Sequence, residues 1–128
     1  MTASREKGLQ IFAEIYGERA ASGLKAHLES NDFGVSTARW AMDMAFGGIW
    51  ASDGLPRKMR SCAVLGMVIA LQQVNEIGYH TKMALANGLT KAEIEEILTT
   101  AIPYCGLPLA STAKAAMLQA FAEVEGAA

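Results

Sequence analysis

The sequence has few of the residues that build disulfide-rich or metal-binding proteins. Its two cysteines, Cys62 and Cys105, stand far apart among 128 residues, which excludes a disulfide framework and favours reduced thiols in a cytoplasmic protein. Its two histidines, His27 and His80, belong to no cluster with ligand spacing. A glycine-rich phosphate loop and the Gly-x-Ser-x-Gly motif of serine hydrolases are both missing. We therefore expect neither a metal nor a cofactor.

Long apolar runs and basic stripes are missing as well. The longest apolar stretch, Cys62 to Leu71, is half of the ~20 residues that a membrane-spanning helix needs. Lysine and arginine number 11 against 13 aspartates and glutamates, a net charge of −2. This balance argues against nucleic acid and anionic membrane surfaces as partners. The segment Met1 to Gly8 lacks the apolar region of an export signal, so we expect no secretion.

What the sequence has in plenty is apolar residues. They make up 52% of the chain, charged residues make up 19%, and the mean hydropathy is +0.20. A small monomer needs more polar cover than this, because so much of its volume lies near the surface. We therefore expect a homo-oligomer. The length suits one domain, and since no repeat or linker interrupts the chain, we expect residues 1–128 to form a single unit.

The apolar residues recur with helical spacing, and no segment alternates like a strand. Leu9, Phe12, Ala13 and Tyr16, for example, share one helix face. We predict an all-α protomer of about seven helices. The first three expected helices are one capped by Ser4, a short one between Gly17 and Gly23, and one from Ser36 to Phe46 that is stopped by Gly47-Gly48. Two helices then span about residues 57–72 and 74–87, and the second of these ends at Gly88. The sixth helix begins with a Thr90–Glu93 capping box and is closed by Pro103 and Gly106, and the last spans about residues 108–123.

Arg60 is a charged residue at the end of an apolar stripe. Val64, Met67, Val68 and Leu71 follow it on the same face, and none of them pairs with a guanidinium. A partly buried guanidinium requires a carboxylate. Two readings remain open: a structural ion pair with a neighbouring helix, or a ligand carboxylate.

Glu76 and His80 lie four residues apart, on a stripe that continues through Met83 and Asn87. A carboxylate one turn from an imidazole orients it, raises its pKa and helps it to move a proton near neutral pH. The alternative is an ordinary surface pair worth a few tenths of a kcal/mol.

Two other residues carry weaker signals. Cys105 has no histidine near it in sequence, which favours a structural thiol over a nucleophile. Trp50 follows Gly47-Gly48, and either closes a pocket or belongs to the core.

An ordered set of motifs resembles the gamma-carboxymuconolactone decarboxylases, within the AhpD-like superfamily. The similarity begins in the stretch from Arg5-Glu6-Lys7-Gly8 to Tyr16-Gly17-Glu18 and covers nearly the whole chain. The motifs are Phe46-Gly47-Gly48-Ile49-Trp50, Gly54-Leu55, Arg60-Ser61, Glu76-x-x-x-His80, Asn87-Gly88-Leu89-Thr90, Glu93-Ile94 and Tyr104-Cys105-Gly106-Leu107-Pro108.

The resemblance implies a ring-like trimer or hexamer of compact helical protomers. It also implies cofactor-free decarboxylation of 4-carboxymuconolactone to 3-oxoadipate enol-lactone, in the protocatechuate branch of aromatic degradation. By position, His80, Glu76 and Arg60 match polar residues that the family places in its pocket, and we expect His80 and Glu76 to be the catalytic pair. Arg60, Trp50, Tyr104 and Met83 are the expected substrate-binding residues.

Three alternatives stay open. The first is a cofactor-free lyase or isomerase on a related lactone or aromatic-pathway acid, favoured by Ser52-Asp53 where close decarboxylases tend to have Arg-Pro. The second is a thiol-dependent peroxide-stress protein that uses Cys62 or Cys105. The paired cysteines of the hydroperoxidases are replaced here by Gln73 and Glu76, which argues against it. The third is a binding protein without turnover.

Overall fold

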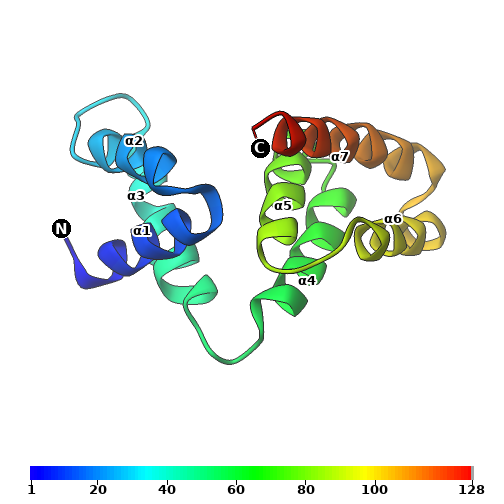
Figure 1. Cartoon of the computed structure of the whole chain (residues 1–128), viewed down its shortest axis with the longest axis horizontal. Coiled ribbons are helices and arrows are strands. Elements are labelled where there is room, and N and C mark those ends of the chain that lie inside the picture. Colours follow the sequence, from blue (N-terminus) through cyan, green and yellow to red (C-terminus); the bar gives the residue numbers. More distant parts are fainter. Residues whose placement is uncertain (128) are drawn as a thin grey trace. The chain divides into compact units, whose positions relative to one another are not determined.

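The computed structural model describes residues 1–127 and is all-α within them, with no strand. The chain forms two compact units, Met1–Leu55 and Pro56–Ala128. The first unit contains α1 (Ala3–Tyr16), α2 (Glu18–Leu28), α3 (Val35–Trp40) and the π-helix η1 (Ala41–Trp50). The second contains α4 (Arg57–Ala70), α5 (Val74–Ala86), α6 (Lys91–Cys105) and α7 (Leu107–Ala127) (Figure 1). The predicted all-α class is confirmed, and the single domain stays a prediction.

In the first unit, α1 packs against η1 at backbone contact. A Cβ atom on Gly47 would lie 2.0 Å from the carbonyl oxygen of Ser4, and one on Gly8 would lie 2.2 Å from that of Met42. Both positions therefore require glycine. The prediction that Gly47-Gly48 ends a helix was wrong, because η1 runs through both residues. Here glycine allows two helices to approach and does not stop one.

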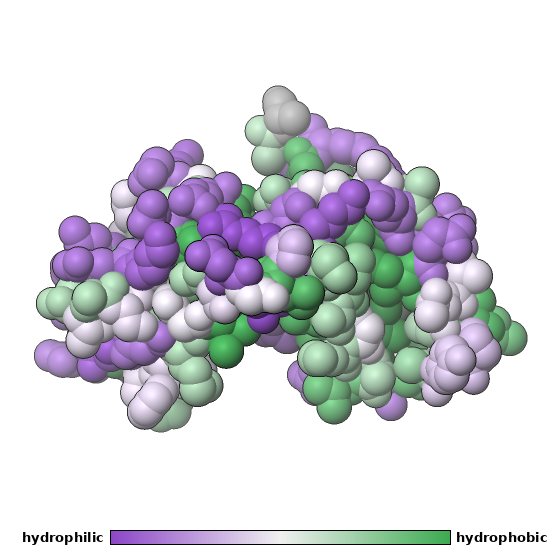
Figure 2. Space-filling model, turned by 90° about the horizontal axis from the view of Figure 1, so that it is seen from below, coloured by the Kyte–Doolittle hydropathy of each residue, from purple (hydrophilic) through white to green (hydrophobic). Residues whose placement is uncertain are grey.

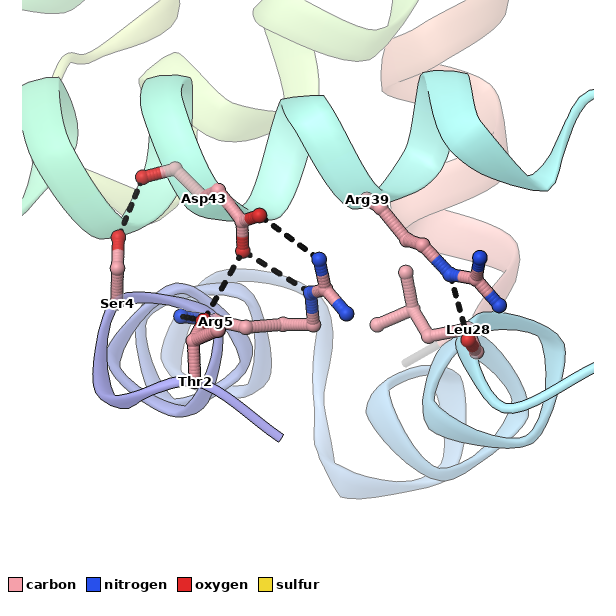
Figure 3. A network of polar contacts seen from close by, with 6 residues as sticks. All are labelled: Thr2, Ser4, Arg5, Leu28, Arg39 and Asp43. Carbon is pink, nitrogen blue, oxygen red and sulfur yellow. Dashed lines mark hydrogen bonds and ion pairs between the residues drawn. The ribbon is translucent and has the colours of Figure 1, made fainter.

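A polar cluster ties the start of α1 to Asp43 of η1 (Figure 3). Arg5 donates from Nε to Oδ1 of Asp43 at 3.0 Å and from Nη2 to Oδ2 at 2.8 Å, and Ser4 Oγ donates to the Asp43 carbonyl oxygen at 2.5 Å. Ser4 is therefore not the helix cap that the sequence predicted. Thr2 caps α1, and its hydroxyl accepts from the Arg5 N–H at 3.1 Å.

Two further boundaries in this unit differ from the prediction. Gly23 lies inside α2, which continues to Leu28. The third helix begins at Val35 after Gly34, whose positive φ of 82° allows the chain to turn, and Ser36 is not its cap. Both errors come from interpreting single glycines and serines as punctuation without knowing what packs against them.

In the second unit, the predicted boundaries are close to those observed. The capping box is present: the Thr90 hydroxyl accepts from the Glu93 N–H at 3.1 Å, and the Glu93 carboxylate accepts from the Thr90 N–H at 3.0 Å. Gly88 has the expected positive φ, 99°. The exceptions are Pro103, which lies inside α6, and α7, which starts at Leu107 and extends beyond Glu123.

The second unit encloses a continuous apolar core. Its buried members come from all four helices and the loop before α6, and include Leu65, Ile69, Ile77, Ala84, Leu89, Ile94, Ala113 and Met117. Apolar side chains also reach solvent, among them Met59, Met67, Leu71, Tyr104, Leu107 and Leu118. Figure 2 shows hydrophobic surface interspersed with hydrophilic residues on the face drawn there. No helix within residues 1–127 is long and apolar enough to cross a bilayer.

Candidate active site

Glu76 and His80 are neighbours on α5, as predicted. Glu76 lies in the first turn, and its Oε2 is 3.5 Å from Nε2 of His80 one turn later. The two side chains differ in exposure: 17% for His80 and 51% for Glu76. The pair therefore joins a largely covered imidazole to a carboxylate that reaches solvent, an arrangement that can pass a proton from water to a sheltered site.

The pKa of His80 is lowered from its ordinary value of 6.5, because burial disfavours the charged imidazolium. The negative charge of Glu76 acts in the opposite direction and raises the pKa, but its effect is the smaller. The sequence-based expectation that Glu76 raises the pKa of His80 is therefore correct for the effect of Glu76 itself. The overall shift is nevertheless downward, because the effect of burial is larger. Without ligand, His80 is mainly neutral at pH 7.

Arg60 lies in the first turn of α4 and is half-buried. Its Nε is covered from solvent and has no hydrogen-bond partner. No carboxylate within residues 1–127 forms an ion pair with it, although its neighbour Lys58 pairs with Glu93 of α6 at 3.1 Å. The structural ion pair considered from the sequence is therefore not observed among the described residues. A buried guanidinium donor requires an acceptor, and this part of the chain supplies none to Nε.

The other predicted substrate-binding residues have different surroundings. Met83, one turn after His80, is fully buried among core side chains, so it can touch a substrate only if neighbours move. Tyr104 is 86% exposed near the end of α6. Trp50 is buried at the end of η1, in the first unit. The structure thus places Arg60, Glu76 and His80 in the second unit, together with Met83 and Tyr104, and Trp50 in the first.

The cysteines are both free thiols: Cys62 is exposed on α4, and Cys105 is half-buried at the end of α6. Among residues 1–127, no group of three or more histidines, cysteines, aspartates and glutamates is arranged to hold a metal ion.

Sequence reasoning missed a hollow of about 190 Å³ between α5 and α7. Its lining includes Gly78, Ala116 and Ala120, together with Lys82 and Glu123, which form an ion pair. None of the predicted site residues lines it. Its signal in the sequence is small residues four apart on α7, a pattern equally typical of ordinary helix packing.

Sequence reasoning also missed a polar link between α4 and α5. Asn87 donates from Nδ2 to Oγ of Ser61 at 3.0 Å. Both residues were noted in motifs, but a contact between positions 26 apart leaves no periodic signal in a single sequence.

Comparison with known proteins identifies the family. A sequence model described as the carboxymuconolactone decarboxylase family matches residues 36–119, a range that contains all six predicted site residues. The chain belongs to this family. A 4-carboxymuconolactone decarboxylase from Acinetobacter baylyi is 31% identical to it over 108 residues, which is 84% of this chain and 79% of that relative.

A second relative is a nitrosuccinic acid decarboxylase from Metarhizium robertsii. It is 42% identical over 66 residues, which is 52% of this chain and 46% of that protein. The match therefore spans less than half of the fungal relative. Both relatives are named decarboxylases, and together with the family match they support a carboxy-lyase.

Proposed function

We propose that this protein decarboxylates 4-carboxymuconolactone to 3-oxoadipate enol-lactone without a cofactor, in the protocatechuate branch of the β-ketoadipate pathway. The observation that carries the proposal is the second unit's combination of a His80–Glu76 pair with a guanidinium that no carboxylate within residues 1–127 neutralises. The Acinetobacter relative, similar over most of both chains, supports the choice of substrate.

The reaction makes two demands on these residues. When the bond between the γ-carbon and its carboxylate breaks, CO2 leaves and the electron pair moves through the ring to form a dienolate. The negative charge of this dienolate lies largely on the lactone carbonyl oxygen. One proton must then reach the α-carbon. Hydrogen-bond donors fixed near the developing oxyanion typically contribute ~3 kcal/mol each, and a positioned proton donor contributes about 10²- to 10⁴-fold in rate.

His80 is the proton carrier in this proposal, and Glu76 replenishes it. The lowered pKa leaves the free imidazole mainly neutral at pH 7. A bound carboxylate substrate adds negative charge, which raises the pKa of a nearby imidazole and favours uptake of a proton through the exposed Glu76. Protonation is thereby coupled to substrate binding, and the dienolate meets an acid as it forms.

Arg60 holds the carboxylate that the substrate retains, through charge-assisted hydrogen bonds. Trp50, Tyr104 and Met83 complete the proposed substrate-binding set. In this role the apolar side chains exclude water, which favours the departure of neutral CO2 from a charged carboxylate.

The second candidate substrate is an acid related to 4-carboxymuconolactone. The substrates named for the two relatives, taken together, favour this alternative. Nitrosuccinic acid and 4-carboxymuconolactone share one frame: a carbon that bears a carboxylate, a CH2-carboxylate and a group able to accept an electron pair. Loss of CO2 leaves a nitronate in the first and a dienolate in the second. One site with an arginine for the retained carboxylate and a histidine for the proton suits both, so a substituted succinate with another acceptor group is the alternative substrate.

Proton NMR of the purified protein with 4-carboxymuconolactone in D2O tests the proposal. We expect loss of CO2 and one deuterium at the α-carbon of the enol-lactone. An unchanged spectrum from folded protein would reject this substrate. The same experiment with nitrosuccinate then tests the alternative, since deuterium would enter at the carbon that carries the nitro group.

Assembly, domain organisation and location complete the proposal. We expect a cytoplasmic homo-oligomer, a trimer or hexamer of single-domain protomers. The apolar composition and exposed residues such as Met67 and Leu107 support self-association. Light scattering measures the assembly. Thiol titration before and after peroxide tests the remaining redox alternative at Cys62 and Cys105, which inert thiols would exclude.

A further inference from the structure

The hydrogen bond between Asn87 and Ser61 joins a half-buried side chain to a buried one. Ser61 is 1% exposed and is followed on α4 by the core residues Leu65 and Ile69. Asn87 follows the last turn of α5, next to the core residue Ala84 on that helix. Its Nδ2 donates to the serine Oγ at 3.0 Å. A buried hydroxyl requires such a partner, and the bond has a geometry that apolar contacts lack.

This bond connects the two helices that carry the proposed chemistry. The helices α4 and α5 are joined by a short turn at residues 71–73, lie side by side, and run in opposite directions (Figure 1). Ser61 is the residue after Arg60, so the bond anchors the arginine's end of α4 to the end of α5. His80 lies seven residues before Asn87, which is about 10 Å along the helix axis.

We infer that Asn87 is a positioning residue, whose hydrogen bond to Ser61 fixes the register of α5 against α4 and so sets the separation between Arg60 and His80. Apolar contacts between two helices tolerate small axial shifts, because the hydrophobic effect is not directional. A single polar pair with one buried member is the kind of feature that selects one register. The functional consequence rests on the proposed function, whereas the geometric consequence does not.

The test replaces both polar groups. The single variant Asn87→Leu leaves the Ser61 hydroxyl buried without a partner and is expected to lower stability. The double variant Ser61→Ala/Asn87→Leu removes both groups, which restores stability but leaves no bond to select the register. Thr81→Val is the matched control: Thr81 is also fully buried on α5, but its hydroxyl donates to the Ile77 carbonyl of its own helix at 2.7 Å.

The kinetic readout is KM against kcat for 4-carboxymuconolactone. In the double variant we expect KM to rise about tenfold or more with a smaller change in kcat, since the arginine no longer meets the retained carboxylate at the right distance from His80. We expect Thr81→Val to keep the wild-type KM. A double variant with wild-type stability and wild-type KM would show that the bond is merely structural, and would overturn the inference.

A second readout does not depend on turnover. Because Nε of Arg60 is covered, its N–H proton is expected to exchange slowly with water, as NMR measures. A shifted register uncovers it, so exchange in the double variant should be about tenfold faster or more than in the wild type and in Thr81→Val. Unchanged exchange overturns the inference. Faster exchange in a protein whose wild type does not convert the lactone supports the inference and rejects the proposed function.

Discussion

The two units each contain a partly buried arginine near the start of a helix, and the two arginines differ in what surrounds them. Arg5 in the first unit forms two hydrogen bonds with Asp43, and this contact raises the pKa of the arginine and lowers that of the aspartate. Arg60 in the second unit has a covered Nε with no hydrogen-bond partner among residues 1–127. The comparison teaches that one residue type can be fully paired within the protein in one unit and keep a buried donor without an acceptor in the other.

The two histidines repeat this difference. His27 of α2 lies 3.5 Å from Asp32, and both of these side chains are substantially exposed. His80 is at the same distance from Glu76 but is largely covered, and burial lowers its pKa. The first unit therefore uses its polar groups to hold helices together. The second contains a covered guanidinium Nε and a largely covered imidazole.

The largest expected effect on stability is on the packing of the first unit. Gly47→Ala puts a Cβ atom 2.0 Å from the Ser4 carbonyl oxygen, a backbone atom that cannot move aside without displacing α1. We expect a loss of about 3 kcal/mol or more in the free energy of unfolding, measured by denaturant titration. Gly48→Ala is the matched control, because its Cβ would meet only the Asp43 carbonyl oxygen at 3.7 Å. Equal effects of the two substitutions would contradict the backbone contact.

The next largest effect separates the two arginines. Arg60→Ala removes the proposed contact with the substrate carboxylate, so we expect KM to rise roughly 10- to 100-fold, equivalent to about 1.5–3 kcal/mol, with stability unchanged or improved. Arg5→Ala is expected to lower the melting temperature, because it leaves Asp43 without its main partner. We expect this variant to keep the wild-type KM. Steady-state kinetics and thermal melts of both variants are the measurement. An unchanged KM in Arg60→Ala would return that residue to a structural role.

The smallest effect concerns pH. The folded-state pKa of His80 lies below its ordinary value of 6.5, so between these two values the unfolded chain binds more protons than the folded one. Stability that is present above about pH 6.5 is therefore partly lost as pH falls toward the folded pKa.

Melting curves at several pH values test this prediction. The melting temperature of the wild type should fall more between about pH 7.5 and pH 5.5 than that of His80→Gln, which does not titrate. Parallel curves would show that burial does not lower this pKa. The Glu76→Gln variant sharpens the test, because without the carboxylate the pKa of His80 should be lower still.

The boundaries in the second unit could be predicted from sequence because its signals are local. A capping box forms from Thr90 and Glu93, three residues apart, and the apolar residues of α4 and α5 recur at 3.6-residue spacing. The Glu76–His80 pair could be found for the same reason: residues four apart on a helix are neighbours.

The first unit could not be predicted in this way, because long-range contacts determine its helices. From the sequence, Ser4 is a good candidate for a helix cap. In the structure its hydroxyl instead donates to the carbonyl oxygen of Asp43, which is 39 residues away. Gly47 looks like a helix end until α1 is seen against it. The same limit applies to the site. Sequence shows that Arg60 needs a partner, but only the structure shows that no carboxylate in the described part of the chain supplies one.

The central claim is that His80 supplies the proton for decarboxylation. The most direct test is to measure kcat of the His80→Gln variant with 4-carboxymuconolactone. The His27→Gln variant is the matched control. Glutamine keeps a hydrogen-bond donor but carries no proton that titrates near neutral pH. The account predicts a fall in kcat of about 10²- to 10⁴-fold for His80→Gln, an unchanged kcat for His27→Gln, and a folded protein in both. A His80→Gln variant that keeps kcat within about threefold of the wild type would contradict it.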